Sequence, residues 1–170
     1  MDLIAKHCPN GLSVLDRFHV VAKMNLALDD VRAAEARRMA QEGYEPALKK
    51  SRWCLRKRPE YLTDQQRLRL RDLLRYNLQS ARAYLLKEEF QQFWEYDSPT
   101  WAGKFLDQWC SKALRTRIGP IKKFVRTVRN HHELLLNSFR TREHTGSIGF
   151  SVPVDRTPIL IAAEPISKTA

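Results

Sequence analysis

The stretch Leu12–Val21, LSVLDRFHVV, joins a short apolar run, an aspartate and the start of a periodic segment. Leu12–Leu15 is typical of a short buried strand, because it lies between a turn signal and a charged residue. From Phe18 to Gln41 apolar residues recur at steps of three and four, which predicts a helix that stops at Gly43. The predicted buried face of this helix holds Val21, Met24, Leu28, Val31 and Ala34.

Asp16 stands between this strand and this helix, and two interpretations of it are open. An aspartate before a helix is a favoured N-cap, because its carboxylate accepts hydrogen bonds from the first backbone N–H groups. A carboxylate at the end of a buried strand is also where two-metal nucleases place a metal ligand, since rigid backbone holds an oxygen that stays open to Mg²⁺. The local chemistry alone favours the cap.

The segments that follow, up to residue 143, predict helices almost throughout. Thr63 and Gln66 form a capping-box pattern, Thr at the cap and Gln three residues later, which opens a long helix. Two further helices are expected after the breaks at Ser98-Pro99 and Gly119-Pro120. The fold class is therefore mainly α, with one short strand that cannot pair with itself. The expected helical segments are 46–58 (a short helix and a basic loop), 63–96, 98–113 and 121–139.

The composition points to a polyanionic partner. The chain has 170 residues, with 30 Lys and Arg against 19 Asp and Glu, and a net charge of +11. Such an excess favours nucleic acid before a membrane surface. No apolar run approaches the roughly 20 residues of a spanning helix, and the first residues do not resemble a signal peptide. Cys8, Cys54 and Cys110 are far apart and odd in number, which favours free thiols in a cytoplasmic protein, and no zinc-site spacing occurs.

The charge is unevenly distributed along the chain. Residues 144–170 carry two cations and two acidic residues, so the whole excess lies in residues 1–143. The same last segment holds three of the eight prolines and shows no helical periodicity, and its apolar run at 158–163 predicts at most a short strand. We therefore expect a folded basic unit over 1–143 and an irregular, divergent tail over 144–170, which can be disordered.

Two segments concentrate the cations. The first basic segment, residues 49–58, holds six cations around Trp53, and the second basic segment, residues 112–129, holds seven cations and no acidic residue. Lys and Arg neutralise phosphates, and a Trp among them can stack on a base or sugar. The alternative is that both segments are solvated faces and that Trp53 belongs to the core. The residues predicted to contact DNA are Lys49, Lys50, Arg52, Trp53, Arg56, Lys57, Arg58, Lys112, Arg115, Arg117, Lys122, Lys123, Arg126 and Arg129.

Several motifs carry a resemblance to a known family, in order and over about residues 1–142: LDRFHVV at 15–21, LKKSRW at 48–53, KRPE at 57–60, AYLLKE at 83–88 and LLNSF at 135–139. The chain resembles the DDE transposases of the ISL3 insertion-sequence family. This resemblance implies a partial RNase H-like catalytic core over 1–43 and a helical insertion region over 44–143. It also implies DNA as the partner, Mg²⁺ as the cofactor of the intact family, and Asp16 as the second catalytic carboxylate and a metal ligand.

The departures from the family pattern bear on activity. The family has a first catalytic Asp on an earlier strand and a third carboxylate in a Glu-Gly-x-Asn motif, and neither is found here. Glu143 comes too early, and Glu164 lacks the context of that motif. Because one aspartate cannot place two Mg²⁺ ions, we expect a truncated, inactive transposase that at most binds DNA.

Two other interpretations of the sequence remain open. The chain can be a stand-alone basic helical nucleic-acid-binding protein without catalysis, which interferes with a full-length transposase as its partner. It can also be a product that does not fold and has no function. The salt dependence of DNA binding separates the truncated transposase and the stand-alone binding protein from the product that does not fold, because contacts to phosphate weaken steeply as salt rises.

Overall fold

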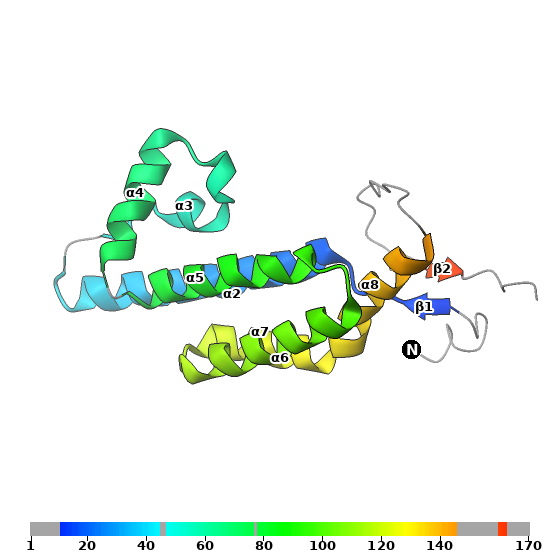
Figure 1. The fold of residues 1–170 in the computed structure, drawn as a ribbon. Helices are drawn as coiled ribbons and strands as arrows, with labels where there is room; N and C mark the ends of the chain where they lie inside the picture. The colour runs from blue at the N-terminus through cyan, green and yellow to red at the C-terminus, as the bar shows by residue number, and fades with distance from the viewer. Residues whose placement is uncertain (1–10, 45–46, 77, 146–159, 163–170) are drawn as a thin grey trace, which may run out of the picture.

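The computed structural model describes residues 11–44, 47–76, 78–145 and 160–162, and these are mainly helical, as predicted (Figure 1). No helix among them is long and apolar enough to cross a membrane. Residues 146–159 and 163–170, most of the predicted tail, lie outside the described residues. The elements in chain order are β1 (Gly11–Ser13), α2 (Arg17–Gln41), α3 (Arg52–Arg56), η1 (Pro59–Tyr61), α4 (Asp64–Arg75), α5 (Gln79–Gln91), η2 (Gln92–Glu95), α6 (Pro99–Arg115), α7 (Gly119–Asn130), α8 (His132–Thr145) and β2 (Leu160–Ala162).

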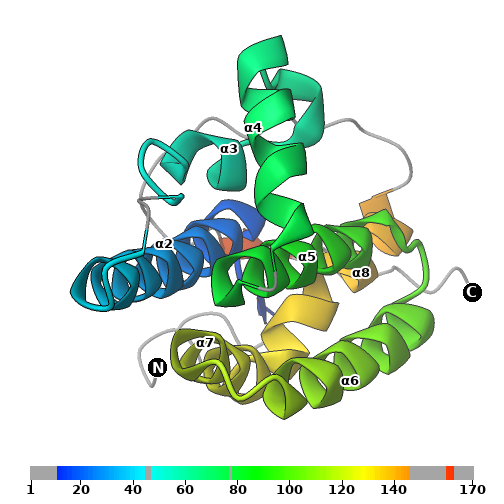
Figure 2. The same cartoon turned by 90° about the vertical axis from the view of Figure 1, so that its left-hand side faces the viewer.

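The helices α2 and α5 lie side by side, with α6 and α7 on one side of the pair (Figures 1 and 2). The core between these helices is aromatic. The ring centroid of Phe90 lies 4.7 Å from that of Trp109, 5.4 Å from that of Phe124 and 5.9 Å from that of Phe93. Trp109 Nε1 donates to the carbonyl oxygen of Leu86 at 3.0 Å, so its polar atom is satisfied inside the core. Helices from both sides of residue 43 therefore contribute to one core.

Helix α2 begins and ends close to the predicted residues. Asp16 Oδ1 accepts a hydrogen bond from the backbone N–H of Phe18 at 3.0 Å, and Gly43 follows the last turn with φ +74°, a conformation that glycine adopts without strain. The predicted buried face is correct only in part, since Val21 is half-buried and Ala34 is exposed. The buried face is shifted from the predicted one because α2 packs on both α5 and α7. The buried residues are Val20, Met24, Ala27, Leu28, Val31 and Glu35.

The single helix expected over residues 63–96 is wrong. The capping box at its start is present, with both hydrogen bonds between Thr63 and Gln66 formed. The chain then leaves the helical conformation, because α4 ends at Arg75 and Tyr76 is extended with ψ 141°. A new helix, α5, begins at Gln79 and ends at Gln91, and the 3-10 turn η2 follows it directly.

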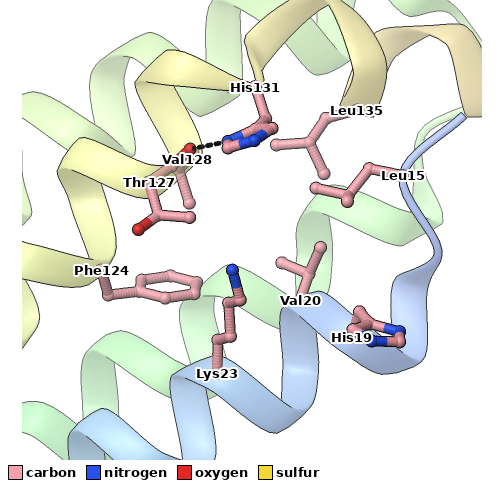
Figure 3. A pocket seen from close by; sticks show the side chains of 9 residues that line it. All are labelled: Leu15, His19, Val20, Lys23, Phe124, Thr127, Val128, His131 and Leu135. Atoms are coloured by element: carbon pink, nitrogen blue, oxygen red, sulfur yellow. Dashed lines mark hydrogen bonds between the residues drawn. The ribbon is translucent and has the colours of Figure 1, made fainter. Parts of the chain in front are cut away.

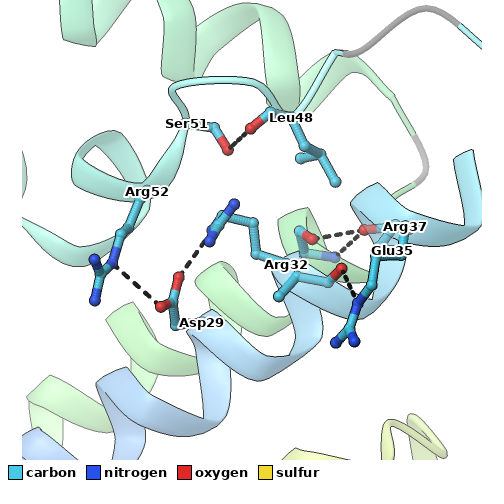
Figure 4. Close-up of polar contacts among 9 residues, drawn as sticks. Asp29, Arg32, Glu35, Arg37, Leu48, Ser51 and Arg52 are labelled. Carbon is cyan, nitrogen blue, oxygen red and sulfur yellow. Dashed lines mark hydrogen bonds and ion pairs between the residues drawn. The ribbon is translucent and has the colours of Figure 1, made fainter. Parts of the chain in front are cut away.

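Glu35 of α2 accounts for the separate start of α5 (Figure 4). Glu35 is 4% exposed, and its carboxylate accepts from the backbone N–H groups of Gln79 and Ser80, each at 2.8 Å. It also accepts from the Ser80 hydroxyl at 2.6 Å. Leu78, which precedes α5, has no side-chain group that could cap the helix. The cap is therefore supplied by a residue 44 positions earlier in the chain.

The helix expected over residues 121–139 is also divided, so this prediction is wrong at residue 131. Helix α7 ends at Asn130, and His131 has φ −118° and ψ 23° before α8 begins. The backbone N–H of His131 contacts the Thr127 carbonyl oxygen at 3.2 Å, and Nδ1 of its ring lies 2.8 Å from the same oxygen. The turn lets α8 pack on α6, so that Leu135 and Phe139 reach the core from another direction.

The strand β1 has a partner within the chain. It pairs antiparallel with β2, with Leu12 opposite Ile161. A strand without a partner was expected here, whereas the described residues contain two short strands, and β2 lies within the apolar run 158–163, which predicted at most a short strand. The pairing satisfies backbone groups that an isolated strand would leave open. The RNase H-like sheet that the family resemblance implies stays a prediction.

Residues 47–76, which we term the α3–α4 projection, stand out from the α2–α5 pair in both views (Figures 1 and 2). Within the projection α3 packs on α4, and it also packs on α2. The projection is therefore attached, through a small apolar centre, to the remaining helices α2 and α5 to α8, which we term the body. Its buried residues are Leu48, Ser51, Cys54, Leu55, Leu62, Leu70 and Leu73.

Candidate nucleic-acid interface

The first basic segment lies on α3 and on the turns at either end of it. Trp53 is 55% exposed, so the alternative that placed it in the core is wrong. The guanidinium carbons of Arg52 and Arg56 lie 5.7 and 5.8 Å from the centroid of its ring. These distances fit cation–π contacts, which hold an aromatic face in a fixed place among positive charges. The arrangement suits stacking on a base or sugar together with neutralisation of phosphates.

The cations of the first basic segment differ in how far they are already paired. Arg52 Nε lies 3.2 Å from Asp29 of α2, which also accepts from Arg32 at 2.8 Å (Figure 4). Lys57 Nζ donates to the side-chain oxygen of Gln66 at 3.3 Å. Arg52 is therefore partly neutralised. No carboxylate of the described residues lies within 4.0 Å of Lys49, Lys50, Arg56 or Arg58.

Helix α4 adds cations that the sequence analysis missed. The α3–α4 projection as a whole has ten Lys and Arg against three Asp and Glu. Its two tyrosines, Tyr61 and Tyr76, are 72% and 59% exposed, so aromatic rings accompany these cations as well. The signal was the recurrence of Arg67, Arg71 and Arg75 every four residues, which places them along one face of a helix whose buried residues are Leu70 and Leu73. The additional exposed arginines are Arg67, Arg69, Arg71 and Arg75.

The second basic segment lies on the end of α6, on the turn that follows and on α7. Lys112 pairs with Glu89 of α5 at 2.9 Å. Arg117 occupies the turn with φ 60°. The remaining five residues are exposed or half-buried, and none has a carboxylate of the described residues within 4.0 Å: Arg115, Lys122, Lys123, Arg126 and Arg129.

The structure does not bring the two basic segments together. Helices α3 and α4 lie on one side of the α2–α5 pair, and α6 and α7 lie on the other side (Figures 1 and 2). Positive charge consequently forms two separate surfaces. A nucleic acid bound at the α3–α4 projection would not reach the second basic segment by continuing along the same face.

Asp16 serves as the N-cap of α2, and its side chain stays half exposed, at 51%. His19 Nδ1 lies 3.6 Å from its second carboxylate oxygen. Among the described residues no group of three or more His, Cys, Asp or Glu side chains lies close enough together to hold a metal ion. Asp16 can offer one oxygen ligand, but the described side chains do not complete a site for Mg²⁺ around it.

A small cleft opens beside the start of α2, between this helix, α7 and the beginning of α8 (Figure 3). It has a volume of about 40 Å³, which is room for one or two water molecules. Its wall is mainly apolar, and Lys23 extends from α2 toward Phe124 and Thr127. His19 and His131 line it at opposite sides. The cleft thus offers a cation and two imidazoles, but no carboxylate.

The described thiols are unsuited to nucleophilic chemistry. Cys54 and Cys110 are free and buried, whereas Cys8 lies outside the described residues. Burial raises the pKa of the Cys54 thiol, and it raises the pKa of Cys110 to about 11. A thiol attacks as its thiolate, so these two groups stay unreactive at neutral pH.

The comparisons with known proteins agree with the resemblance noted in the sequence. The family model for DDE-type ISL3 proteins, described as transposase, matches residues 1–149. The transposase for the insertion sequence element IS1001 of Bordetella parapertussis is 33% identical over 132 residues, which cover 75% of this chain and 32% of that protein. No solved structure matches the chain.

The transposase for the insertion sequence element IS1557 of Mycobacterium tuberculosis is 30% identical over 152 residues. These cover 76% of this chain and 34% of that protein. The chain thus spans about a third of the length of the curated relatives it matches. The family match runs through α2, the α3–α4 projection and α5 to α8, so it includes both basic segments. The chain therefore belongs to the ISL3 family of transposases.

Proposed function

We propose that this chain binds DNA through the α3–α4 projection, with little dependence on base sequence. The observation that carries the proposal is the exposed ring of Trp53 between Arg52 and Arg56, on a projection with ten cations and three acidic residues. The cations contact phosphates, and the ring stacks on a base or sugar. The second basic segment provides a separate contact on the other side of the α2–α5 pair.

The triple substitution Arg56→Gln, Lys57→Gln and Arg58→Gln tests the first surface. We expect it to weaken binding to duplex DNA at low salt by more than about tenfold, because three phosphate contacts are lost. The slope of log K against log salt should become shallower by about 2 to 3, since each phosphate contact contributes about 0.9. Fluorescence anisotropy of a labelled duplex over a series of salt concentrations measures both quantities.

A control for this variant removes the same number of charges elsewhere. Arg37, Lys104 and Arg140 are exposed and lie outside both basic segments, so their replacement by Gln matches the change in net charge. If this control weakened binding as much as the first variant, the effect would come from net charge and not from the α3–α4 projection. If the unaltered chain bound no DNA at low salt, the proposed function would be wrong.

We further propose that Asp16 contributes one oxygen ligand to Mg²⁺ in the intact family site, and that the residues described here do not cut or join DNA alone. The support is its half-exposed carboxylate three residues after the end of β1, combined with the lack of a group of three metal-binding side chains among the described residues. Two-metal chemistry needs several carboxylates that converge on the ions.

Incubation of the chain with Mg²⁺ and cut transposon ends should therefore give no joined products on a denaturing gel. Joined products that disappear in Asp16→Ala would contradict this expectation. The variant Asp16→Asn separates the two roles of Asp16, because an amide oxygen still caps α2 while the charge that a metal needs is lost. Products retained by Asp16→Asn would show that a cap is all that the reaction needs from this side chain.

A second candidate function, a stand-alone nucleic-acid-binding protein that acts on a full-length transposase, is favoured by the aromatic core that α5, α6 and α7 share with the rest of the body. Such a core allows DNA binding without further parts of a transposase. Its test is a strand-transfer assay with a complete ISL3 transposase, to which this chain is added in rising amounts. Inhibition that the triple variant does not produce supports this second function.

A further inference from the structure

The short helix that presents Trp53 cannot hold its own position. Helix α3 has only five residues, and a helix of this length has no stability in isolation. The carbonyl groups at its end also lack partners within the helix. Whatever orients the first basic segment toward DNA must therefore come from other parts of the chain.

Contacts from within the projection hold the beginning of α3. The hydroxyl of Ser51, which is fully buried, donates to the Leu48 carbonyl oxygen at 2.7 Å. The guanidinium of Arg69 on α4 donates to the carbonyl oxygens of Ala47 and Lys49 at 2.6 and 3.2 Å. These contacts tie the segment before α3 to α4. They do not tie the end of α3 to the body.

The end of α3 is held by Lys87, which comes from α5. Lys87 is 2% exposed, an uncommon state for a lysine, and its ammonium lies against the backbone of the first basic segment. It donates to three successive backbone carbonyl oxygens, those of Leu55 at 3.0 Å, Arg56 at 3.4 Å and Lys57 at 3.4 Å. One side chain of α5 thus contacts the carbonyl oxygens of the last two residues of α3 and of the C-cap residue that follows.

The charge of Lys87 is compensated locally. Glu88 Oε1 lies 2.6 Å from its ammonium, and the ring centroid of Tyr84 lies 4.9 Å from it. Burial lowers the pKa of Lys87, while the hydrogen bond and the charge of Glu88 oppose this shift. A buried cation beside several exposed cations is costly unless it has such partners. Methionine has a similar length but carries neither a charge nor a hydrogen-bond donor.

We propose that Lys87 is a positioning residue for DNA binding: its ammonium fixes the backbone of residues 55–57, so that Arg56 and the two cations after it are preorganised for phosphate contacts. Lys87 itself is buried and touches no nucleic acid. The inference rests on the proposed function, because it assigns a cause to the geometry of that same surface. It predicts a variant with weaker binding but an unchanged number of phosphate contacts.

The variant Lys87→Met tests this inference. We expect its affinity for duplex DNA to fall about tenfold, because three side chains must now be ordered on binding. The salt slope should stay within about 0.5 of the original, since no phosphate contact disappears. Limited trypsin digestion should become faster after Arg56 and Lys57, as a released backbone is open to proteolysis. The matched control Lys104→Met, at an exposed position on α6, should change neither affinity nor cleavage appreciably.

The outcomes separate this inference from the proposed function. Unchanged affinity together with unchanged cleavage in Lys87→Met overturns the positioning role and leaves DNA binding intact. A salt slope reduced by one or more means that Lys87 contacts phosphate directly, which also overturns it. If the unaltered chain binds no DNA, the proposed function fails, and the cleavage rates still decide whether Lys87 fixes residues 55–57. Lys87→Gln keeps a hydrogen-bond donor, so its affinity and its cleavage rate should lie between those of the unaltered chain and those of Lys87→Met. It replaces Lys87→Met if the latter does not fold.

Discussion

Replacement of Glu35 by alanine is expected to lower the free energy of unfolding by about 3 kcal/mol, which is a large share of the stability of a small domain. Glu35 is 4% exposed and accepts three hydrogen bonds from the first turn of α5. Its removal leaves the hydroxyl and the N–H of Ser80 without an acceptor in a buried place, since Ser80 is 1% exposed. Unfolding in urea, followed by circular dichroism, measures the change.

Two further variants make this test specific. Glu42→Ala removes the same side chain from an exposed position just after α2, and its stability should differ by less than about 0.5 kcal/mol. Glu35→Gln keeps one carbonyl oxygen as an acceptor, so its loss should lie between those of the two alanine variants. Equal stability of Glu35→Ala and Glu42→Ala would contradict the role of Glu35 as the cap of α5.

Replacement of Trp109 by alanine is expected to cost about 4 kcal/mol, because it removes a large ring from the centre of the core. Trp109 is 1% exposed, and its ring packs against Phe90 and Phe124. The hydrogen bond from its indole N–H to the Leu86 carbonyl oxygen is lost at the same time. Unfolding in urea, followed by circular dichroism, measures this loss as well. A variant that shows no cooperative unfolding transition would agree with a loss large enough to abolish the folded state.

The matched control lies on the same helix. Trp101 is 60% exposed near the start of α6, and its main contact is the ammonium of Lys104, 4.4 Å from the ring centroid. Trp101→Ala should therefore cost less than about 1 kcal/mol. A comparable loss in both variants would show that the aromatic centre contributes no more than an exposed ring on the same helix.

The sequence allowed the elements with local signals to be predicted, and it failed where distant residues decide. The cap at Asp16, the stop at Gly43 and the capping box at Thr63 are local, and all three are present. The division between α4 and α5 depends on Glu35, and no window of sequence around residue 77 contains that information. The division at His131 depends in the same way on where α8 can pack.

The candidate interface was predictable in its composition but not in its arrangement. The density of Lys and Arg located both basic segments, because charge is a property of the residues themselves. Whether a tryptophan is exposed depends on packing, so the sequence could not distinguish Trp53 from Trp109. It also could not show that the two segments lie on different sides of the α2–α5 pair. Nor could it show that the buried ammonium of Lys87 contacts the backbone of the first of them.

The hydrogen bonds between Glu35 and α5 have a consequence for the order in which the chain folds. A helix that carries its own cap can form its first turn as soon as it is synthesised. The first turn of α5 instead has to wait until a loop of more than forty residues has closed and brought α2 alongside it. Because the end of α3 is in turn held by Lys87 of α5, the three helices are expected to reach their final positions together, in one cooperative event.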